Sequence, residues 1–362
     1  IYADKNNRPA KYSKDNVPYT PKHFLPISLD GVAEDDFTLV FGYPGKTNEY
    51  LPSIAIEQII NELNPAKIEI RDKALKVADG FMRKDNAIKI QYASKYASIA
   101  NYWKKWIGET QGLKKSNAVA VKRETEKAFQ QKIAKTGKEK EYGTLLADFD
   151  KNYTEIAPYA VARDYFTEIV LRNTELLSMG YKLYQLEQVY KSRGEQAFTD
   201  RKNNLINGLA DFYKNFNATV DEKVFEQLIE LYAAKSPKQF LPQGLTKKKK
   251  KNLASEIYTK SKLKNYAGLK ELLSGDAKTV LSNLNTDPGF LLVKELADIY
   301  SKEVAPKYDE INLKITALQR TYMKAQLELN TESRIFPDAN STLRVTYGKV
   351  KGYEPKDATI YT

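Results

Sequence analysis

The sequence predicts a mostly α-helical protein whose two ends are β-structured. Residues 1–52 alternate short apolar runs with turn signals and hold six of the fourteen prolines. Residues 53–330 carry apolar side chains at helical spacing, and residues 331–362 return to strand-like alternation. Both β ends are too short to close a core. We therefore expect a helical domain inserted into, or slung between, β parts that are mostly absent from this sequence.

The first β region contains one clear strand. The stretch "DKNNRPA" has the composition of a loop, and residues 37–45, "FTLVFGYPG", predict a buried strand that ends in a Gly-Pro turn. The sequence has no initiator Met and no signal-peptide pattern, so we expect it to be a processed or excised piece of a longer protein.

Two long segments show the clearest helical pattern. Apolar residues recur at steps of three and four along residues 88–106, at Ile88, Tyr92, Tyr96, Ile99, Trp103 and Trp106. A second series recurs at steps of three, four and seven, at Ile311, Ile315, Leu318, Tyr322 and Leu329. Each series forms one stripe on a helix, as in a helical bundle.

Turn-forming stretches divide this region into helices. Breaks are predicted at residues 135–143, around Pro158, at residues 235–244, at residues 285–289 and at Pro306. These breaks predict seven or eight helices packed as bundle hairpins.

The last region begins a sheet. In "STLRVTYGKVKGY", Leu343, Val345 and Tyr347 alternate with the more polar Thr342, Arg344 and Thr346. A period of two residues places the two sets on opposite faces of a strand.

Composition restricts the chemistry. The sequence has no Cys, which excludes disulfides and thiol nucleophiles, and its one His, His23, excludes a multi-histidine metal site. No cofactor is expected. No apolar run reaches the roughly 18 residues that a membrane span requires.

The net charge of +12 and the pI near 9.3 suggest a nucleic acid or an anionic membrane as a partner. Lys and Glu are nevertheless mixed along the helices, and the one basic block, Lys247 to Lys251, stands before an apparent helix. We interpret that block as a solvated charge run, and we expect no nucleic-acid partner.

Two motifs resemble catalytic sequences without fulfilling their requirements. Gly45-Lys46-Thr47 follows a strand, but Val40 occupies the position where a phosphate-binding loop needs its first Gly. The following residues run into Pro52 instead of opening a helix, so we expect a tight turn between strands. Ser274 to Asp276 lacks the order of a serine nucleophile motif, and we expect it to end one helix and start the next, with Asp276 as the cap. His23 lies in a Pro-flanked loop without a nucleophile motif.

Three segments carry a family resemblance. "HFLPISLDGVAEDDFTLVFGYPGKTNEYLPS", "SKYASIANYWKKWIGETQG" and "FPDANSTLRVTYGKVKGYEP" resemble, in this order and separation, the bacterial serine dipeptidyl peptidases of types seven and eleven. The resemblance extends over essentially the whole sequence.

The resemblance implies a chymotrypsin-like double β-barrel with a large helical domain inserted between its halves. Residues 1–52 would then be the end of the first barrel half, residues 53–330 the helical cap of the active-site cleft, and residues 331–362 the start of the second half. The two ends of the chain should therefore lie side by side.

The family removes dipeptides from free amino ends with a Ser, His and Asp triad. Its His and Asp would precede Ile1 and its Ser would follow Thr362. This sequence is therefore expected to hold no catalytic residue and to be inactive alone.

One substrate-binding residue carries over from the resemblance. Asn101, in "IANYWKKW", matches the family's Asn that holds the substrate's amino terminus. Its side-chain carbonyl can accept from an ammonium without carrying charge. Ile99 and Trp103 bracket it, so it should point away from the packed stripe, among small residues at Ser94, Ala97 and Ser98. From the residues alone, Asn101 also fits a polar position on the wet face of a helix. Trp103 and Trp106 are assigned to the core.

The expected partners follow from the same resemblance. They are a peptide with a free amino terminus and the remaining barrel segments of the same protein, and intact members of the family are expected to be homodimers in the periplasm or outside the cell. No membrane span is expected. The alternative is a non-catalytic helical binding or scaffold protein whose β termini pair with a partner.

Overall fold

The computed structural model describes residues 1–247, 252–330 and 334–361. These residues form two compact units, which we call the β unit (Ile1–Glu49 with Pro337–Thr362) and the helical unit (Tyr50–Phe336). The units divide after Glu49 and after Phe336, where the predicted domains divide after residues 52 and 330. The assignment of the flanks to two barrel halves stays a prediction. Most of Lys247 to Lys251 lies outside the described residues.

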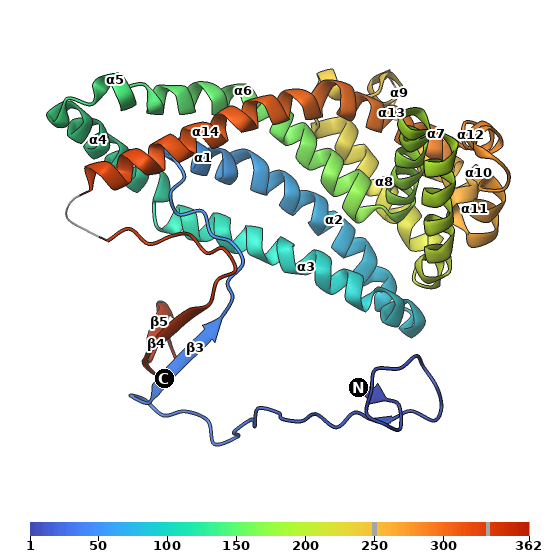
Figure 1. Cartoon of the computed structure of the whole chain (residues 1–362), viewed down its shortest axis with the longest axis horizontal. Coiled ribbons are helices and arrows are strands. Elements are labelled where there is room, and N and C mark those ends of the chain that lie inside the picture. The colour runs from blue at the N-terminus through green and yellow to red at the C-terminus, as the bar shows by residue number, and fades with distance from the viewer. Residues whose placement is uncertain (248–251, 331–333, 362) are drawn as a thin grey trace. The chain divides into compact units, whose positions relative to one another are not determined.

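The helical unit holds fourteen α-helices within the described residues (Figure 1). They are α1 (Ser53–Gln58), α2 (Asn64–Met82), α3 (Asn86–Lys115), α4 (Ala118–Thr136), α5 (Glu139–Tyr142), α6 (Leu145–Tyr165), α7 (Glu175–Lys214), α8 (Ala218–Lys235), α9 (Gln243–Lys247), α10 (Leu253–Lys260), α11 (Tyr266–Leu272), α12 (Ala277–Leu284), α13 (Pro288–Ile299) and α14 (Ala305–Leu329). Single 3₁₀ turns lie at η3 (Lys238–Phe240) and η4 (Lys262–Lys264). The predicted seven or eight helices were too few, because short helices such as α5 and α9 lack a periodic stripe.

Three π-helical segments continue α-helices without a break. They are η1 (Ile59–Leu63) between α1 and α2, η2 (Phe166–Asn173) after α6, and η5 (Tyr300–Val304) between α13 and α14. Pro306 is the second residue of α14 and follows η5, where the Ala305 N–H bonds five residues back to the Tyr300 carbonyl. This wider π turn shifts the hydrogen-bond ladder, and the helix continues through the proline. The predicted break at Pro306 was therefore wrong. The break at Pro158 was also wrong, since that residue lies inside α6.

The remaining predicted breaks are confirmed. Helix α4 ends at Thr136 with Gly137 as its C-cap at a φ of 67°, and α8 ends at Lys235 before the turn at residues 236–242. Gly275 adopts a φ of 100°, and Asp276 caps α12 by accepting from the Thr279 N–H at 2.9 Å. This is the role predicted for Asp276.

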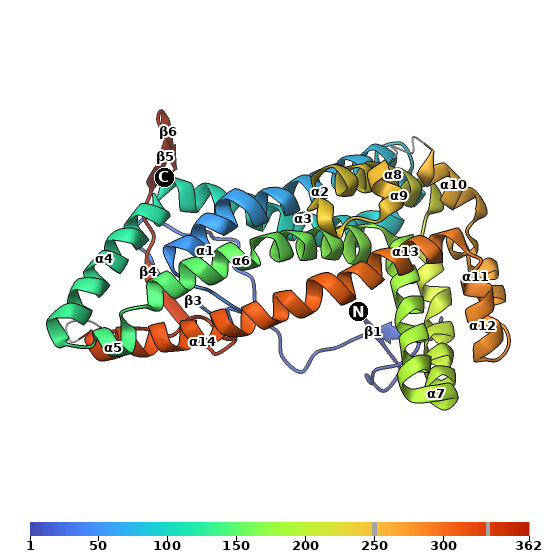
Figure 2. The ribbon, with the colours of Figure 1, turned by 90° about the horizontal axis from the view of Figure 1, so that it is seen from above.

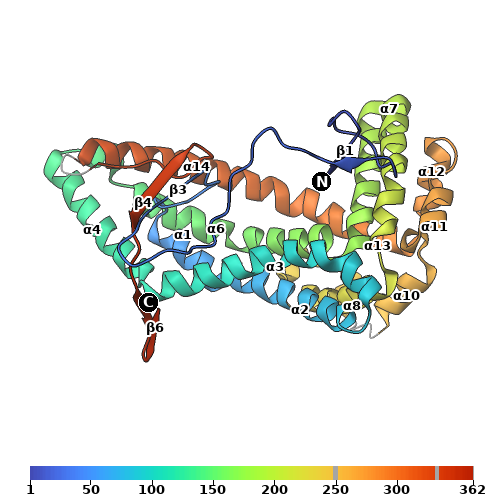
Figure 3. The ribbon, with the colours of Figure 1, turned by 90° about the horizontal axis from the view of Figure 1, so that it is seen from below.

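Helix α7 is a hairpin rather than one straight helix. Gly194 interrupts it with a φ of 79° and a ψ of −169°, a conformation that glycine adopts readily. The two halves lie side by side in Figures 2 and 3.

The long helices bury the predicted stripes. All six apolar residues of the α3 series are buried or half-buried, and so are the five of the α14 series. Helix α3 packs along α2, and α14 runs beside α6 (Figures 1 and 2). The largest core cluster joins α2, η2, α7, α8 and the helices from α10 to α13.

The β unit consists of three separate strand pairs. They are β1 (Tyr2–Ala3) with β2 (Val17–Pro18), β3 (Phe37–Gly42) with β4 (Arg344–Lys349), and β5 (Tyr353–Lys356) with β6 (Thr359–Tyr361), each antiparallel. Strands β3 and β4 are labelled beside each other in Figure 3. In their register, Phe37 lies opposite Lys349 and Gly42 opposite Arg344. The two β regions on either side of the helical region in sequence are thus joined through β3 and β4. That the chain ends themselves lie side by side stays a prediction. No closed barrel forms among the described residues.

Two details of the β prediction were wrong. Strand β3 was expected to be buried, but it has one partner strand and its side chains are exposed. The stretch after β3 is not a turn between strands. It leads to α1, where Pro52 is the last residue before the helix begins. Thr47 instead fastens this stretch, because its hydroxyl donates to Asp338 at 2.6 Å and accepts from the Ala339 N–H.

None of the described helices combines the length and the apolar character that crossing a membrane requires.

Candidate functional site

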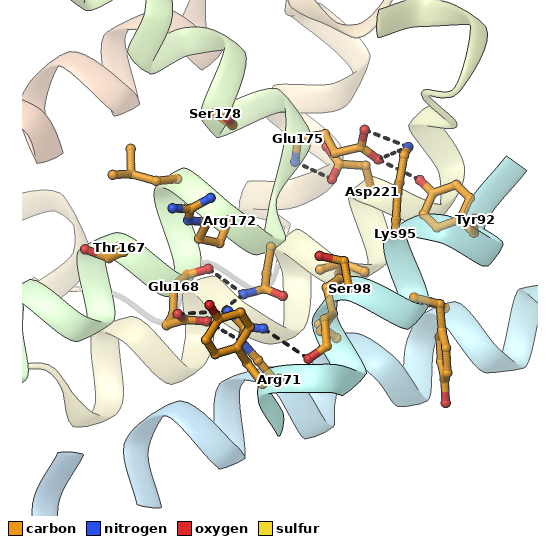
Figure 4. Close-up of a pocket in the computed structure, with 18 of the residues that line it drawn as sticks. Arg71, Tyr92, Lys95, Ser98, Thr167, Glu168, Arg172, Glu175, Ser178 and Asp221 are labelled. Carbon is orange, nitrogen blue, oxygen red and sulfur yellow. Dashed lines mark hydrogen bonds and ion pairs between the residues drawn. The ribbon is translucent and has the colours of Figure 1, made fainter. Parts of the chain in front are cut away.

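A pocket of about 590 Å³ lies within the helical unit, between α2, α3, η2, α7 and α8 (Figure 4). A volume in this range suits a small ligand. Its walls are unusually rich in charge, with Arg71, Lys95, Glu168, Glu175 and Asp221 among the lining residues. These residues form two separate networks, and both contact α3.

The first network centres on Arg71 of α2. Its guanidinium donates to both carboxylate oxygens of Glu168 on η2, at 2.7 and 3.1 Å, and both side chains are more than nine-tenths buried. The remaining nitrogen, Nη1, donates to the backbone carbonyl of Ile99 on α3 at 3.0 Å. The Asn173 amide also donates to Glu168, at 3.1 Å. The guanidinium carbon lies 4.7 Å from the ring centre of Trp106.

The second network joins α3 to the start of α7. Lys95 donates to both carboxylate oxygens of Glu175 at 2.8 Å and also to the Asn215 carbonyl. The Tyr92 hydroxyl donates to Glu175 at 3.0 Å. Burial, followed by the nearby charge of Glu175, raises the pKa of the Tyr92 hydroxyl well above its usual value.

Asp221 of α8 completes this network by capping α7. Its carboxylate accepts from the backbone N–H groups of Glu175 and Leu176 at 2.7 and 2.8 Å, and from the Tyr258 hydroxyl at 2.5 Å. Burial, and then the nearby Glu175 charge, raises the pKa of Asp221 to about 7. Hydrogen bonds from Tyr258 and the backbone oppose this shift without cancelling it.

The pocket can bind and orient a ligand, but it does not assemble a hydrolytic centre. Ser98 and Ser178 line it, yet the single His of the sequence, His23, belongs to an exposed loop of the β unit. Within the described residues, no group of three or more His, Cys, Asp and Glu side chains is placed to hold a metal ion. The charged side chains of the walls link α2 to η2 and α3, α3 to α7, and α8 to α7.

The predicted substrate-binding residue lies on another face of α3. Asn101 is exposed and is not among the residues that line the pocket. Five residues at about 100° each place Trp106 about 140° around the helix from Asn101. Ser94, Ala97 and Ser98 are exposed as well, which leaves room beside the Asn101 amide. Its role toward a substrate stays a prediction.

The two tryptophans were correctly assigned to the core, since Trp106 is buried and Trp103 is half-buried. Trp106 additionally lines the pocket. The sequence analysis did not predict the ion pairs that line the pocket. Arg71 and Glu168 are 97 residues apart in sequence, and Lys95 and Glu175 are 80 apart. An arginine on the apolar side of a helix was the one local signal available.

Comparison with known proteins defines the class. The family model "Peptidase S46" matches residues 1–362, and the chain belongs to this peptidase family, as its resemblance predicted. The chain is 72% identical over 361 residues to the Asp/Glu-specific dipeptidyl-peptidase of Flavobacterium psychrophilum, covering 100% of this chain and 51% of that protein. It is 54% identical over 363 residues to the Asp/Glu-specific dipeptidyl-peptidase of Capnocytophaga gingivalis, with the same coverage.

More distant relatives include dipeptidyl-peptidase 7 of Porphyromonas gingivalis, at 32% identity over 376 residues, covering 100% of this chain and 50% of that protein. Among solved structures, the Porphyromonas endodontalis DPP11 in complex with the dipeptide Arg-Glu superposes with a TM-score of 0.77 at 25% identity. That match covers 100% of this chain and 52% of the solved one. The chain thus spans about half the length of the relatives that it matches.

Proposed function

We propose that this chain is the central part of a serine dipeptidyl-peptidase that releases dipeptides with an acidic second residue from the amino ends of peptides. The observation that carries the proposal is the 72% identity, over the whole chain, to an Asp/Glu-specific dipeptidyl-peptidase. The distant relatives do not distinguish the two specificities, because dipeptidyl-peptidase 7 and the Asp/Glu-specific enzyme of Porphyromonas gingivalis match this chain at 32% and 30% identity. The relatives at 72% and 54% identity both carry the acid-specific name.

The β unit supports the expected place of this chain in a double barrel. One face of the β3–β4 pair is mostly apolar, with Lys349 at one end and with exposed side chains at Phe37, Leu39, Phe41, Val345 and Tyr347. A two-stranded sheet is marginal alone and requires further strands to cover such a face. We propose that residues 1–52 end the first barrel half, that residues 331–362 start the second, and that barrel strands from the rest of the protein cover this face.

In this proposal the helical unit caps the cleft, and Asn101 binds the amino terminus of the substrate. An ammonium loses hydration when it enters a cleft, so it requires fixed acceptors. Asn101 is exposed and lies on the open face of α3. The triad that cleaves the peptide bond would come from outside residues 1–362, and by itself this chain would be inactive.

We further propose that the whole protein is a homodimer in the periplasm or outside the cell. The mass of the purified full-length protein in solution tests whether it is a dimer. Fractionation of the bacterium tests where the protein is located. A monomer, or a protein confined to the cytoplasm, would remove the corresponding part of the proposal.

The test uses the full-length protein and fluorogenic dipeptides with Glu, Asp or Leu in the second position. The proposal predicts release from the acidic substrates, and no release after N-acetylation removes the ammonium. Asn101→Ala should lower kcat/KM about tenfold, or about 1.4 kcal/mol, chiefly through KM. Asn312→Ala, on an exposed position of α14, is the matched control and should leave kcat/KM unchanged.

A full-length protein that releases no dipeptide would favour the scaffold alternative. Preferred cleavage of the Leu substrate would overturn the acidic specificity alone. An unchanged kcat/KM in Asn101→Ala would remove Asn101 from the site.

A further inference from the structure

Helix α3 is held from one side by buried charge. Arg71 donates a hydrogen bond to the Ile99 carbonyl, and Lys95 forms an ion pair with Glu175 of α7. Asn101 lies on the exposed side of the helix. The Arg71–Glu168 pair is the more buried of the two attachments, with side-chain exposures of 8% and 7%. It also touches α3 only two residues before Asn101.

The contact from Arg71 fixes α3 in an unusual way. The Ile99 carbonyl lies in the middle of a helix, where it already accepts the backbone N–H four residues later. A carbonyl oxygen has a second lone pair, and Arg71 Nη1 uses it at 3.0 Å. The rings of Tyr102 and Trp106 lie 5.4 and 4.7 Å from the guanidinium. One cation therefore contacts α3 at residues 99, 102 and 106, a span that includes Asn101.

The guanidinium itself is fixed in orientation. Glu168 accepts from Nε and Nη2, so the planar fork cannot rotate, and Asn173 in turn donates to Glu168. Glu168 comes from η2, a different part of the core. The position of α3 about its own axis is thus set relative to both α2 and η2. A lysine at position 71 would keep the charge but could not make these contacts together.

We propose that Arg71 is a positioning residue for Asn101: by setting the rotation of α3, it aims the Asn101 amide at the amino terminus of the substrate. This inference rests on the proposed function, because it takes Asn101 as the group that binds the ammonium. A rotation of about 10° moves an atom about 6 Å from a helix axis by about 1 Å. A displacement of that size in a binding group can lower activity by up to about 10²-fold.

The experiment is a double-mutant cycle in the full-length protein with an acidic dipeptide substrate. Arg71→Lys is used because removal of the cation would leave Glu168 buried without a partner. Arg71→Lys should lower kcat/KM about tenfold, mostly as an increase in KM. In the Asn101→Ala background it should have less than a twofold effect, because the amide that it aims is gone.

The matched control is a second ion pair with a buried carboxylate in the helical unit. Lys294 of α13 pairs with Glu187 of α7 at 2.8 Å, and neither residue belongs to α2, α3 or η2. Lys294→Met should change kcat/KM by less than twofold in both backgrounds, although it also removes an ion pair. A merely structural role for Arg71 would make the two pairs behave alike.

A second measurement follows α3 directly. The sequence has two Trp residues, Trp103 and Trp106, and both are on α3. Their fluorescence in this 362-residue chain should shift on Arg71→Lys and stay unchanged on Lys294→Met, with the far-ultraviolet circular dichroism of both variants equal to that of the parent chain.

The outcomes separate the two proposals. If Asn101→Ala lowers kcat/KM but Arg71→Lys does not, or if the two effects simply multiply, the positioning role is wrong and the proposed function stands. If Asn101→Ala has no effect, the assignment of Asn101 under the proposed function fails, and the role of Arg71 fails with it. Unchanged Trp fluorescence in Arg71→Lys would likewise overturn the positioning role.

Discussion

The helical unit and the β unit contain similar apolar side chains and bury them very differently. In the described part of the chain, every buried apolar residue belongs to the helical unit except Ala3. In the β unit, Phe24, Leu25, Phe41 and Tyr347 are all exposed. The difference shows that an apolar pattern predicts which face of a helix or strand becomes buried, but does not predict which other element packs against that face.

The physical cause is the number of elements available to each unit. Helices such as α2, α3, α6 and α14 bury one another's stripes within residues 50–336. The β unit has three isolated strand pairs, which cannot enclose a core. The helical unit thus has a hydrophobic core of its own, as a complete domain does, whereas the β unit has the strand pairs of a domain without its core.

The largest effect that we expect from this contrast is in limited proteolysis. Trypsin should cleave after Lys22, in an exposed irregular stretch, on the order of 10⁴-fold faster than after Lys67, which lies on α2 and pairs with Asp164 at 3.3 Å. Cleavage at a core helix requires an opening that costs much of the global stability, whereas an exposed loop is already accessible. Mass spectrometry of timed digests measures both rates, and equal rates would contradict the contrast.

A pair of Phe substitutions tests the same contrast through stability. Phe149 of α6 is fully buried and makes an edge contact with Tyr322, with ring centres 5.6 Å apart. Phe149→Ala should lower the free energy of unfolding by about 3–5 kcal/mol, through lost burial and the cavity left behind. Phe41→Ala, at a side chain that is 65% exposed, should change it by less than about 0.5 kcal/mol in this chain.

Urea unfolding followed by circular dichroism gives both values. Phe41→Ala should also be measured in the full-length protein. There the proposed barrel would cover Phe41, so the loss in free energy of unfolding should be larger than in this chain. A similar cost for Phe149→Ala and Phe41→Ala in this chain would mean that the β unit has a core of its own.

The smallest expected effect is a pH dependence of stability that arises from Asp221 in the helical unit. Because burial raises the pKa of Asp221 from 3.8 to about 7, the folded protein holds a proton that the unfolded chain releases between these values. The contribution of this group to stability is therefore fully present below about pH 4 and is lost as the pH rises toward 7. Over this range, the melting temperature of the parent chain should fall relative to that of Asp221→Asn, which does not titrate.

Thermal melts at pH 4.5, 5.5 and 7, at constant ionic strength, measure this difference. Asp276, an exposed helix cap whose pKa is lowered by hydrogen bonds from Thr279, provides the control. Asp276→Asn should show no comparable change over the same range. A constant difference between the parent chain and Asp221→Asn would mean that Asp221 stays ionised in the folded protein.

The sequence by itself determined the features that depend on neighbouring residues. The stripe on α3, the stripe on α14 and the Asp276 cap were all predicted, because each follows from spacing within one or two helical turns. The family also followed from the sequence, because three segments carried its pattern.

Only the tertiary structure decided which distant residues meet. It set the register in which β3 pairs with β4, continued a helix past Pro306 through a π turn, and placed Arg71 against Glu168 and Ile99. Periodicity gives the direction in which a side chain points along its own element. The partner that it meets depends on how whole elements pack, which is a property of the assembled core.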